Sequence, residues 1–272
     1  MSQNISVSKT KALIESAIMV AIATVLSMIK LMNLPYGGSV TIGCMLPIII
    51  IGYRHGIRWG LVSGLVFGIL QQLLDLNTLS YVTTWQSIVA VIFLDYIIAF
   101  LVIGLGGVFR KSMPQHKALA VGTVTVCLLR YLCHVISGAT VWAGLSIPTN
   151  AALWYSIGYN ATYMVPETIV TATLAYYVGS VLDLNQENVI HLAKTGKEPV
   201  PVQKWIGGLL LSAVLVFDIR SIFVHLQNAE SGEFDATGFT SVNWTMLLTV
   251  TVVICVIAFI LFRFIPKQTR TQ

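Results

Sequence analysis

Charged residues are scarce in this sequence. Asp, Glu, Lys and Arg together make up 10% of its 272 residues, whereas hydrophobic residues make up 56%. Soluble domains carry about a quarter charged residues, so a chain this poor in charge could not cover a surface exposed to water. Its apolar segments are continuous and lack the two-residue alternation of barrel strands. The sequence therefore predicts an all-α polytopic membrane protein embedded in the lipid bilayer.

Several sequence motifs of ATP-binding proteins and hydrolases are also absent. The chain has no G-x-x-x-x-G-K-[ST] loop for ATP, and no H-E-x-x-H or G-x-S-x-G motif of a hydrolase. Its four cysteines lie in apolar segments at unrelated spacings, which indicates neither a disulfide framework nor a metal site. We therefore expect no enzyme activity, no cofactor, no metal and no nucleic-acid partner. An intramembrane enzyme that uses Asp95 and His134 as acid and base remains an alternative.

The apolar runs predict eight membrane spans, separated by glycine, proline or charged residues. They lie at residues 10–32, 40–54, 57–75, 83–108, 117–141, 152–182, 204–226 and 244–266. The second is short, and we expect it to be tilted or partly re-entrant. A polar cytoplasmic linker, 183–203, separates a six-span unit, 1–182, from a two-span C-terminal extension, 204–272, of unknown role.

The basic residues indicate how the spans are oriented. Thirteen of the sixteen Lys and Arg residues fall on one set of connections: Lys9, Lys11, Arg54, Arg58, Arg110, Lys111, Lys117, Lys194, Lys197, Lys204, Arg263, Lys267 and Arg270. Lys and Arg concentrate in cytoplasmic loops of membrane proteins. We therefore expect a multi-pass protein of a bacterial cell membrane with both termini in the cytoplasm.

Four ionisable residues stand out within the predicted spans: Asp95, Arg130, His134 and Glu167. Such residues are costly in a bilayer and are functional candidates by default. Asp95 and Arg130 lie at similar depths in adjacent antiparallel spans, so we expect them to form an ion pair, with His134 one helical turn beyond Arg130. A purely structural pair is the alternative. Glu167 follows Pro166, and a structural bond to backbone groups freed by the proline is as reasonable for it as a functional role.

Further polar and aromatic residues gather on the outer side of this pair: Gly138, Trp142, Tyr155, Asn160 and Tyr163. Together with Asp95 they predict a pocket for a flat, cationic ring compound. The carboxylate supplies the counter-charge, tryptophan a cation–π contact, and Asn and Tyr hydrogen bonds to ring nitrogens. Each aromatic alone would also suit the membrane interface, and Asn160 alone could bond a neighbouring helix.

Four segments resemble the thiamine-specific substrate-binding (S) components of energy-coupling factor vitamin transporters. They are LPYGGSVTIGCMLPIIIIGYRHG (34–56), FLDYIIAFLVIGLGGVFR (93–110), LLRYLCHVISGATVWAG (128–144) and WYSIGYNATYMVPE (154–167). The resemblance covers residues 8–182. It implies a six-helix bundle that captures thiamine from outside and works with a transmembrane coupling protein and two cytoplasmic ATPases, which would explain the missing ATP loop. An S-component for another vitamin, or for a thiamine precursor, is the rival.

The resemblance also implies roles for individual residues. It places Asp95 and Tyr96 near the thiazolium, Arg130 in support of that carboxylate, His134 and Gly138 in the pocket wall, Trp142 stacked on the ligand, and Tyr155 and Asn160 at the aminopyrimidine. Tyr36, Gly37, Gly38 and Ser39 correspond to the lid, and Ala17 and Ala21 to the motif that docks the coupling protein. The chain departs from the family in having Asp95 where at least some members have glutamate, and in lacking the lid tryptophan.

Overall fold

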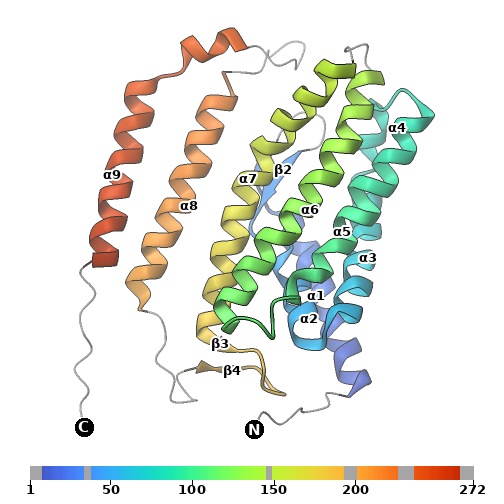
Figure 1. The fold of residues 1–272 in the computed structure, drawn as a ribbon, viewed down its shortest axis with the longest axis vertical. Coiled ribbons are helices and arrows are strands. Elements are labelled where there is room, and N and C mark those ends of the chain that lie inside the picture. The colour runs from blue at the N-terminus through green and yellow to red at the C-terminus, as the bar shows by residue number, and fades with distance from the viewer. Residues whose placement is uncertain (1–7, 34–37, 145–148, 193–200, 226–235, 264–272) are drawn as a thin grey trace. The chain divides into compact units, whose positions relative to one another are not determined.

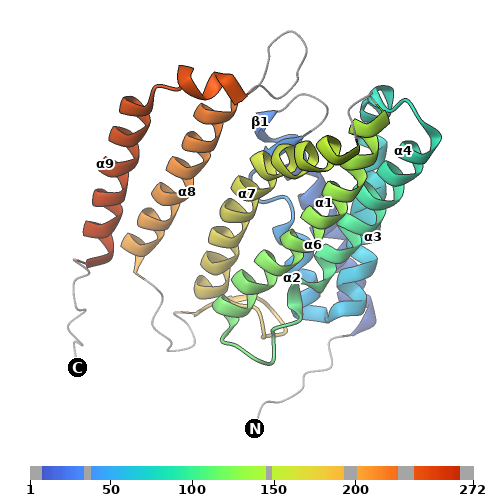
Figure 2. The same cartoon turned by 45° about the horizontal axis from the view of Figure 1, so that its top comes forward.

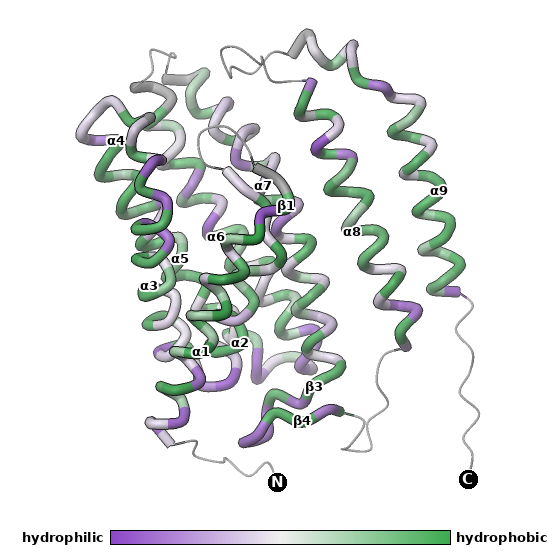
Figure 3. The backbone as a smooth tube through the Cα atoms, turned by 180° about the vertical axis from the view of Figure 1, so that it is seen from behind, coloured by the Kyte–Doolittle hydropathy of each residue, from purple (hydrophilic) through white to green (hydrophobic). Residues whose placement is uncertain are grey.

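The computed structural model describes residues 8–33, 38–144, 149–192, 201–225 and 236–263. Its contacts divide the chain into two compact units, residues 1–191 and residues 192–272. The boundary falls inside the polar segment 183–203. Each unit is built from helices whose residues are mostly hydrophobic along their length (Figure 3).

The first unit begins with α1 (Lys9–Met28), whose first turn is capped by the Ser8 hydroxyl accepting a hydrogen bond from the backbone of Lys11. A short antiparallel hairpin follows, β1 (Lys30–Asn33) and β2 (Ser39–Thr41). Then come α2 (Leu46–His55) and α3 (Ile57–Leu74), joined by Gly56 alone. Gly56 has a φ of 91°, a conformation that glycine adopts without strain, so the chain turns within one residue.

The rest of this unit changes helix type along its length. After η2 (Leu76–Tyr81) the chain forms α4 (Trp85–Ala90), the π-helical segment η3 (Val91–Ile98), α5 (Ala99–Leu101) and the 3₁₀ segment η4 (Val102–Gly107). Two long helices, α6 (Gln115–Gly144) and α7 (Thr149–Val181), then lie side by side (Figures 1 and 2). The strands β3 (Leu182–Asp183) and β4 (Ile190–His191) end the unit.

The second unit is a helical hairpin of α8 (Val202–Phe223) and α9 (Trp244–Arg263), with η6 (Ala236–Ser241) before α9. Leu247 and Ala258 of α9 are buried. Between the helices, the Thr251 hydroxyl lies 2.8 and 2.9 Å from the two carboxylate oxygens of Asp218. Most other α9 side chains are exposed, as expected of a helix that faces lipid.

Six helical segments of the described chain are long and apolar enough to cross a membrane: Lys9–Met28, Ile57–Leu74, Trp85–Gly107, Gln115–Val141, Val202–Ile222 and Trp244–Arg263. The prediction of an all-α membrane protein is confirmed. Two of the eight expected spans differ. α2 has ten residues, or ~15 Å at ~1.5 Å per residue, about half of the bilayer core. α7 is long enough, but its many polar residues keep it out of this apolar set.

Glycines bring α3 into backbone contact with the segment that follows the π-helix. A Cβ atom on Gly104 would lie 2.1 Å from the carbonyl carbon of Gly60, so no side chain fits there. Residues without side chains let membrane helices approach closely enough for dispersion forces between their backbones. This contact fixes η4, and hence the π-helical segment before it, against α3.

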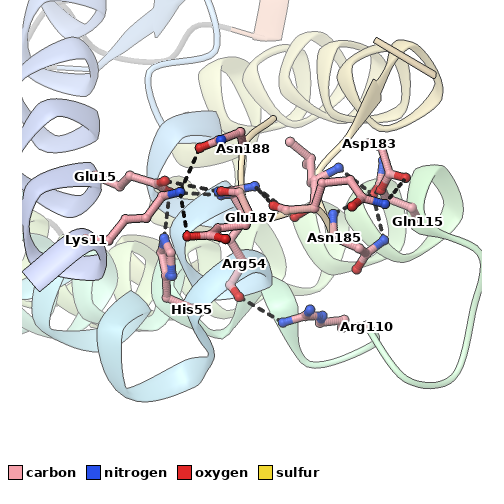
Figure 4. Close-up of polar contacts among 12 residues, drawn as sticks. Lys11, Glu15, Arg54, His55, Arg110, Gln115, Asp183, Asn185, Glu187 and Asn188 are labelled. Carbon is pink, nitrogen blue, oxygen red and sulfur yellow. Dashed lines mark hydrogen bonds and ion pairs between the residues drawn. The ribbon is translucent and has the colours of Figure 1, made fainter. Parts of the chain in front are cut away.

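A polar network, the Arg54 network, joins the first helix of the first unit to the segment that follows α7 (Figure 4). It lies at one end of that unit. The guanidinium of Arg54 donates to both carboxylate oxygens of Glu15, at 3.0 and 3.1 Å. It also donates to the carbonyls of Leu184, Gln186 and Glu187, at 2.9, 3.3 and 3.2 Å. Because the five donors of a guanidinium are fixed in one plane, a single side chain holds α1, α2 and the segment after α7 together.

The glycine contact predicts that Gly104→Ala destabilises the protein. The added methyl group would have to push two backbones apart, at a cost of about 1–3 kcal/mol or more. Thermal unfolding of the detergent-purified protein measures this, with Gly158→Ala as the matched control, since a Cβ at Gly158 meets no atom within 4 Å. Equal melting temperatures for the two variants would contradict the close packing.

Candidate functional site

A cavity of about 410 Å³ lies within the first unit. Its walls come from the β1–β2 hairpin, the last turn of α3, the π-helical segment, and the middle of α6 and of α7. On α3, α6 and α7 these residues lie away from the helix ends that are near the Arg54 network. The volume is within the range of about 300–1,000 Å³ that is typical of small-molecule sites.

Asp95 reaches the cavity from the π-helical segment. Its Oδ1 lies 2.8 Å from His134 Nδ1, and its Oδ2 accepts a hydrogen bond from the Ser137 hydroxyl at 2.9 Å. The side chain stays 20% exposed, so part of the carboxylate faces the cavity. Single π-turns within helices are frequent at functional sites because they displace side chains from the regular helical register.

Arg130 is buried, with 6% of its surface exposed, and its carboxylate neighbour is Glu167 of α7. Nη1 lies 3.9 Å from Glu167 Oε2 and also contacts the Met45 sulfur, while the guanidinium stands 4.7 Å above the Phe100 ring. Among the described residues, no ion pair joins Arg130 to Asp95. The predicted Asp95–Arg130 pair is therefore wrong. The rise along the two helices places Asp95 and Arg130 at a similar depth, but the Glu167 carboxylate, on a third helix, lies closer to Arg130.

Glu167 is 3% exposed and connects three parts of the unit. Its Oε1 accepts hydrogen bonds from the Thr41 hydroxyl at 2.8 Å and from the Cys44 thiol at 3.7 Å, and its Oε2 faces Arg130. The expected bonds to backbone groups freed by Pro166 are not what holds it. Glu167 instead ties α7 to the end of β2 and to α6.

His134 separates Arg130 from Asp95. Arg130 Nη2 lies 3.5 Å from His134 Nε2, on the opposite side of the ring from Asp95. A guanidinium can only donate, so a hydrogen bond from Arg130 requires the tautomer in which Nε2 accepts and Nδ1 carries the proton given to Asp95. In that tautomer the imidazole adds no positive charge beside Asp95.

Asn160 and two tyrosines form the opposite wall on α7. The Asn160 amide nitrogen donates to the Ser156 carbonyl at 2.8 Å and to the His134 carbonyl at 3.3 Å, while its oxygen accepts from the Tyr163 hydroxyl at 2.5 Å. The Tyr159 hydroxyl accepts a hydrogen bond from the backbone of Gly38, at 3.2 Å. The wall is thereby fixed to α6 and to the residue that precedes β2.

The structure brings most of the predicted binding residues together. Those that line the cavity are Gly38, Ser39, Asp95, Tyr96, Arg130, His134, Gly138, Asn160 and Tyr163. Tyr155 does not line it; its ring stacks on Tyr159 with centroids 6.3 Å apart. The side chain of Trp142, and Tyr36 and Gly37 as a whole, lie outside the described residues. Ala17 and Ala21 are exposed on α1.

The polar cavity residues that sequence reasoning missed include Lys30, Asp75, Tyr159 and, as a binding-site residue, Glu167. Asp75 accepts a hydrogen bond from the Tyr96 hydroxyl at 3.0 Å. A signal for Glu167 was present, because Asn160, Tyr163 and Glu167 are spaced to share one helical face. Among the described residues, no group of His, Cys, Asp and Glu is arranged to hold a metal ion.

The chain is similar to proteins that are named as thiamine transporters. A thiamine transporter ThiT of Bacillus subtilis is 39% identical over 173 residues, covering 59% of this chain and 85% of the relative. A thiamine transporter ThiT of Lacticaseibacillus paracasei is 27% identical over 203 residues, covering 68% and 92%. The solved structure of ThiT from Listeria monocytogenes has the same fold, with a TM-score of 0.51, 24% identity, and coverage of 62% of this chain and 92% of that one.

A family model, described as thiamine transporter protein, matches residues 13–184. The match covers more than half of the chain and most of the first unit, which contains the cavity. The second unit lies outside it. The resemblance read from the four sequence segments is thus confirmed. This chain is a multi-pass membrane protein that belongs to the thiamine transporter family.

Proposed function

We propose that residues 1–182 form an S-component that captures thiamine from outside the cell and delivers it to an energy-coupling module. The observation that carries this proposal is the partly exposed Asp95 carboxylate in a cavity of suitable size, with His134 and Ser137 as its hydrogen-bond partners. Membership of the thiamine transporter family supports thiamine as the ligand.

The charges around the cavity favour a cation. Arg130 faces Glu167, and Lys30 and Asp75, of opposite formal charge, also line the cavity. The hydrogen bonds described for Asp95 join it to His134 and Ser137, which leaves its carboxylate for a cation. Two unit charges 4 Å apart attract by about 4 kcal/mol at an effective dielectric constant of about 20. Asp95 would therefore contribute directly to binding the thiazolium ring, and Tyr96, His134 and Gly138 would shape the wall around it.

The remaining ligand contacts follow from the resemblance. Asn160 would recognise the aminopyrimidine, because its oxygen holds Tyr163 and keeps a second lone pair. Trp142 would stack on a ring, and Tyr155 would act from behind Tyr159. Residues 36–39 would close the cavity as a lid, with Gly38 already bonded to the Tyr159 hydroxyl.

The cavity would open to the outside. Arg54 and Arg110 lie at the other end of the bundle, and the positive-inside rule assigns that end to the cytoplasm. The same rule keeps both termini in the cytoplasm. This orientation suits capture of an external vitamin, with release inside after the S-component reorients.

A coupling protein and two ATPases would supply the energy. The relatives are transporters by name, and this sequence has no ATP-binding loop. Ala17 and Ala21 stand exposed one turn apart on α1, where two small side chains would let a partner helix approach closely. We propose this face of α1 as the contact with the coupling protein.

The rival enzyme function has one observation in its favour, the 2.8 Å contact between His134 and Asp95. A general base in such a pair needs its second nitrogen free to take a proton from a nucleophile. Here that nitrogen faces the guanidinium of Arg130. The arrangement therefore favours binding over catalysis. An S-component for an uncharged vitamin is also less suited, because such a ligand would leave Asp95 without a counter-charge.

Purified protein is expected to bind thiamine with a saturable change in tryptophan fluorescence. The physical reason is that a ring stacked near Trp142 alters the emission of that indole. The measurement is a titration at micromolar ligand, with an uncharged vitamin of similar size as the comparison. A thiamine curve that does not saturate would contradict the proposed function.

Asp95→Asn should weaken thiamine binding by at least about tenfold, which corresponds to about 1.4 kcal/mol. The substitution keeps the size of the side chain and removes the charge that attracts the thiazolium. Asp218→Asn is the matched control, because Asp218 lies in α8 and outside the cavity. Normal affinity in Asp95→Asn, measured by calorimetry, would show that the cation binds elsewhere.

Replacing both Ala17 and Ala21 by leucine should abolish co-purification with the coupling protein and ATPases while thiamine binding persists. Leucine at both positions would hold a partner helix away from α1. Ala213→Leu, an equal enlargement of an exposed residue on α8, serves as the control. Recovery of the intact complex with the double variant would remove α1 from the docking surface.

A further inference from the structure

We propose that Glu167 determines the preference of the cavity for a cation by holding Arg130 away from Asp95. Glu167 is a positioning residue in this scheme, because it acts through Arg130. The inference rests on the proposed function, since it assumes a ligand with a cationic ring.

The first step is the pairing itself. Arg130 and Glu167 both line the cavity, and both are almost completely buried. Their closest charged atoms are 3.9 Å apart. A buried charge that loses its partner is strongly unfavourable, so each of these residues needs the other or a substitute.

The second step is that a substitute is near. The imidazole ring of His134 contacts both Arg130 and Asp95, at 3.5 Å on one side and 2.8 Å on the other. Arg130 also has a nitrogen, Nε, without a hydrogen-bond partner in the described structure. Without the negative charge of Glu167, the guanidinium would be drawn toward Asp95, the next carboxylate along the same wall.

The third step is the effect on the ligand. With Glu167 present, Arg130 and Glu167 cancel each other and Asp95 attracts the cation. With Glu167 neutral, Arg130 and Asp95 cancel, and the deep part of the cavity has no net charge to offer a thiazolium. The selectivity between a charged and an uncharged ring should therefore depend on a residue that need not touch the ligand.

Glu167→Gln isolates this effect. Glutamine has nearly the same shape, and its amide oxygen can still accept the Thr41 hydroxyl, so the link from α7 to β2 is kept. The measured quantity is the affinity ratio between thiamine and its uncharged isostere, in which a benzene ring replaces the thiazolium. The ratio should fall by about tenfold or more, in keeping with the pKa shifts of ~1–3 units that a nearby charge causes.

Two further variants separate charge from structure. Arg130→Met should keep or raise the ratio, because an unpaired Glu167 either stays negative or takes up a proton. The double variant, Arg130→Met with Glu167→Gln, should restore the ratio of the unmodified protein.

Each outcome decides between the possibilities. A lowered ratio in Glu167→Gln that the double variant restores supports the inference. Equal weakening of both ligands by Glu167→Gln would mean a merely structural role and would overturn it. If Glu167→Gln does not fold, Arg130→Met serves as the test. A lower affinity ratio in Arg130→Met overturns the inference, and an equal or higher ratio supports it. Failure of the unmodified protein to bind thiamine at all would overturn the proposed function as well.

Discussion

The buried contact between Arg130 and Glu167 is the interaction on which the rest of the site depends. It neutralises the only guanidinium that lines the described cavity, and it joins the middle of α6 to the middle of α7. Through Thr41 it also reaches the end of the β1–β2 hairpin, which precedes α2. Arg130 faces Glu167, no ion pair joins it to Asp95 among the described residues, and the Asp95 side chain remains partly open to the cavity. One pair of charges thus sets both the packing and the electrostatics of the binding region.

The rest of the first unit holds that region from the end that lies away from the cavity. Close contact between Gly60 and Gly104 fixes the broken helix that carries Asp95 against α3. Gly60 also approaches Gly52, two residues before Arg54, and at this end the Arg54 network joins α1, α2 and the segment after α7. The cavity lies between a rigid helical frame and a short hairpin. Such a division suits a binding protein, in which the frame holds the polar groups and a loop admits the ligand.

The second unit raises a different question, because the family match ends at residue 184. Its two helices make an apolar hairpin in which the Thr251 hydroxyl contacts the carboxylate of Asp218. The described residues that line the cavity all belong to the first unit. The hairpin lies outside the segment that the family model matches.

Composition and periodicity were enough to establish a helical membrane protein, and the segment motifs were enough to establish its family. Depth along the helices also placed Asp95 and Arg130 at similar levels, with His134 one turn further out and Asn160 on the outer side, because the rise per residue is constant. The tertiary structure decided which of these groups touch. Pairing depends on helix rotation and on local changes of helix type, such as the π-helical segment at Asp95, which leave no mark in a hydrophobic pattern. Arg130 consequently faces Glu167 of a third helix, because that carboxylate comes within 4 Å while the ring of His134 stands in front of Asp95.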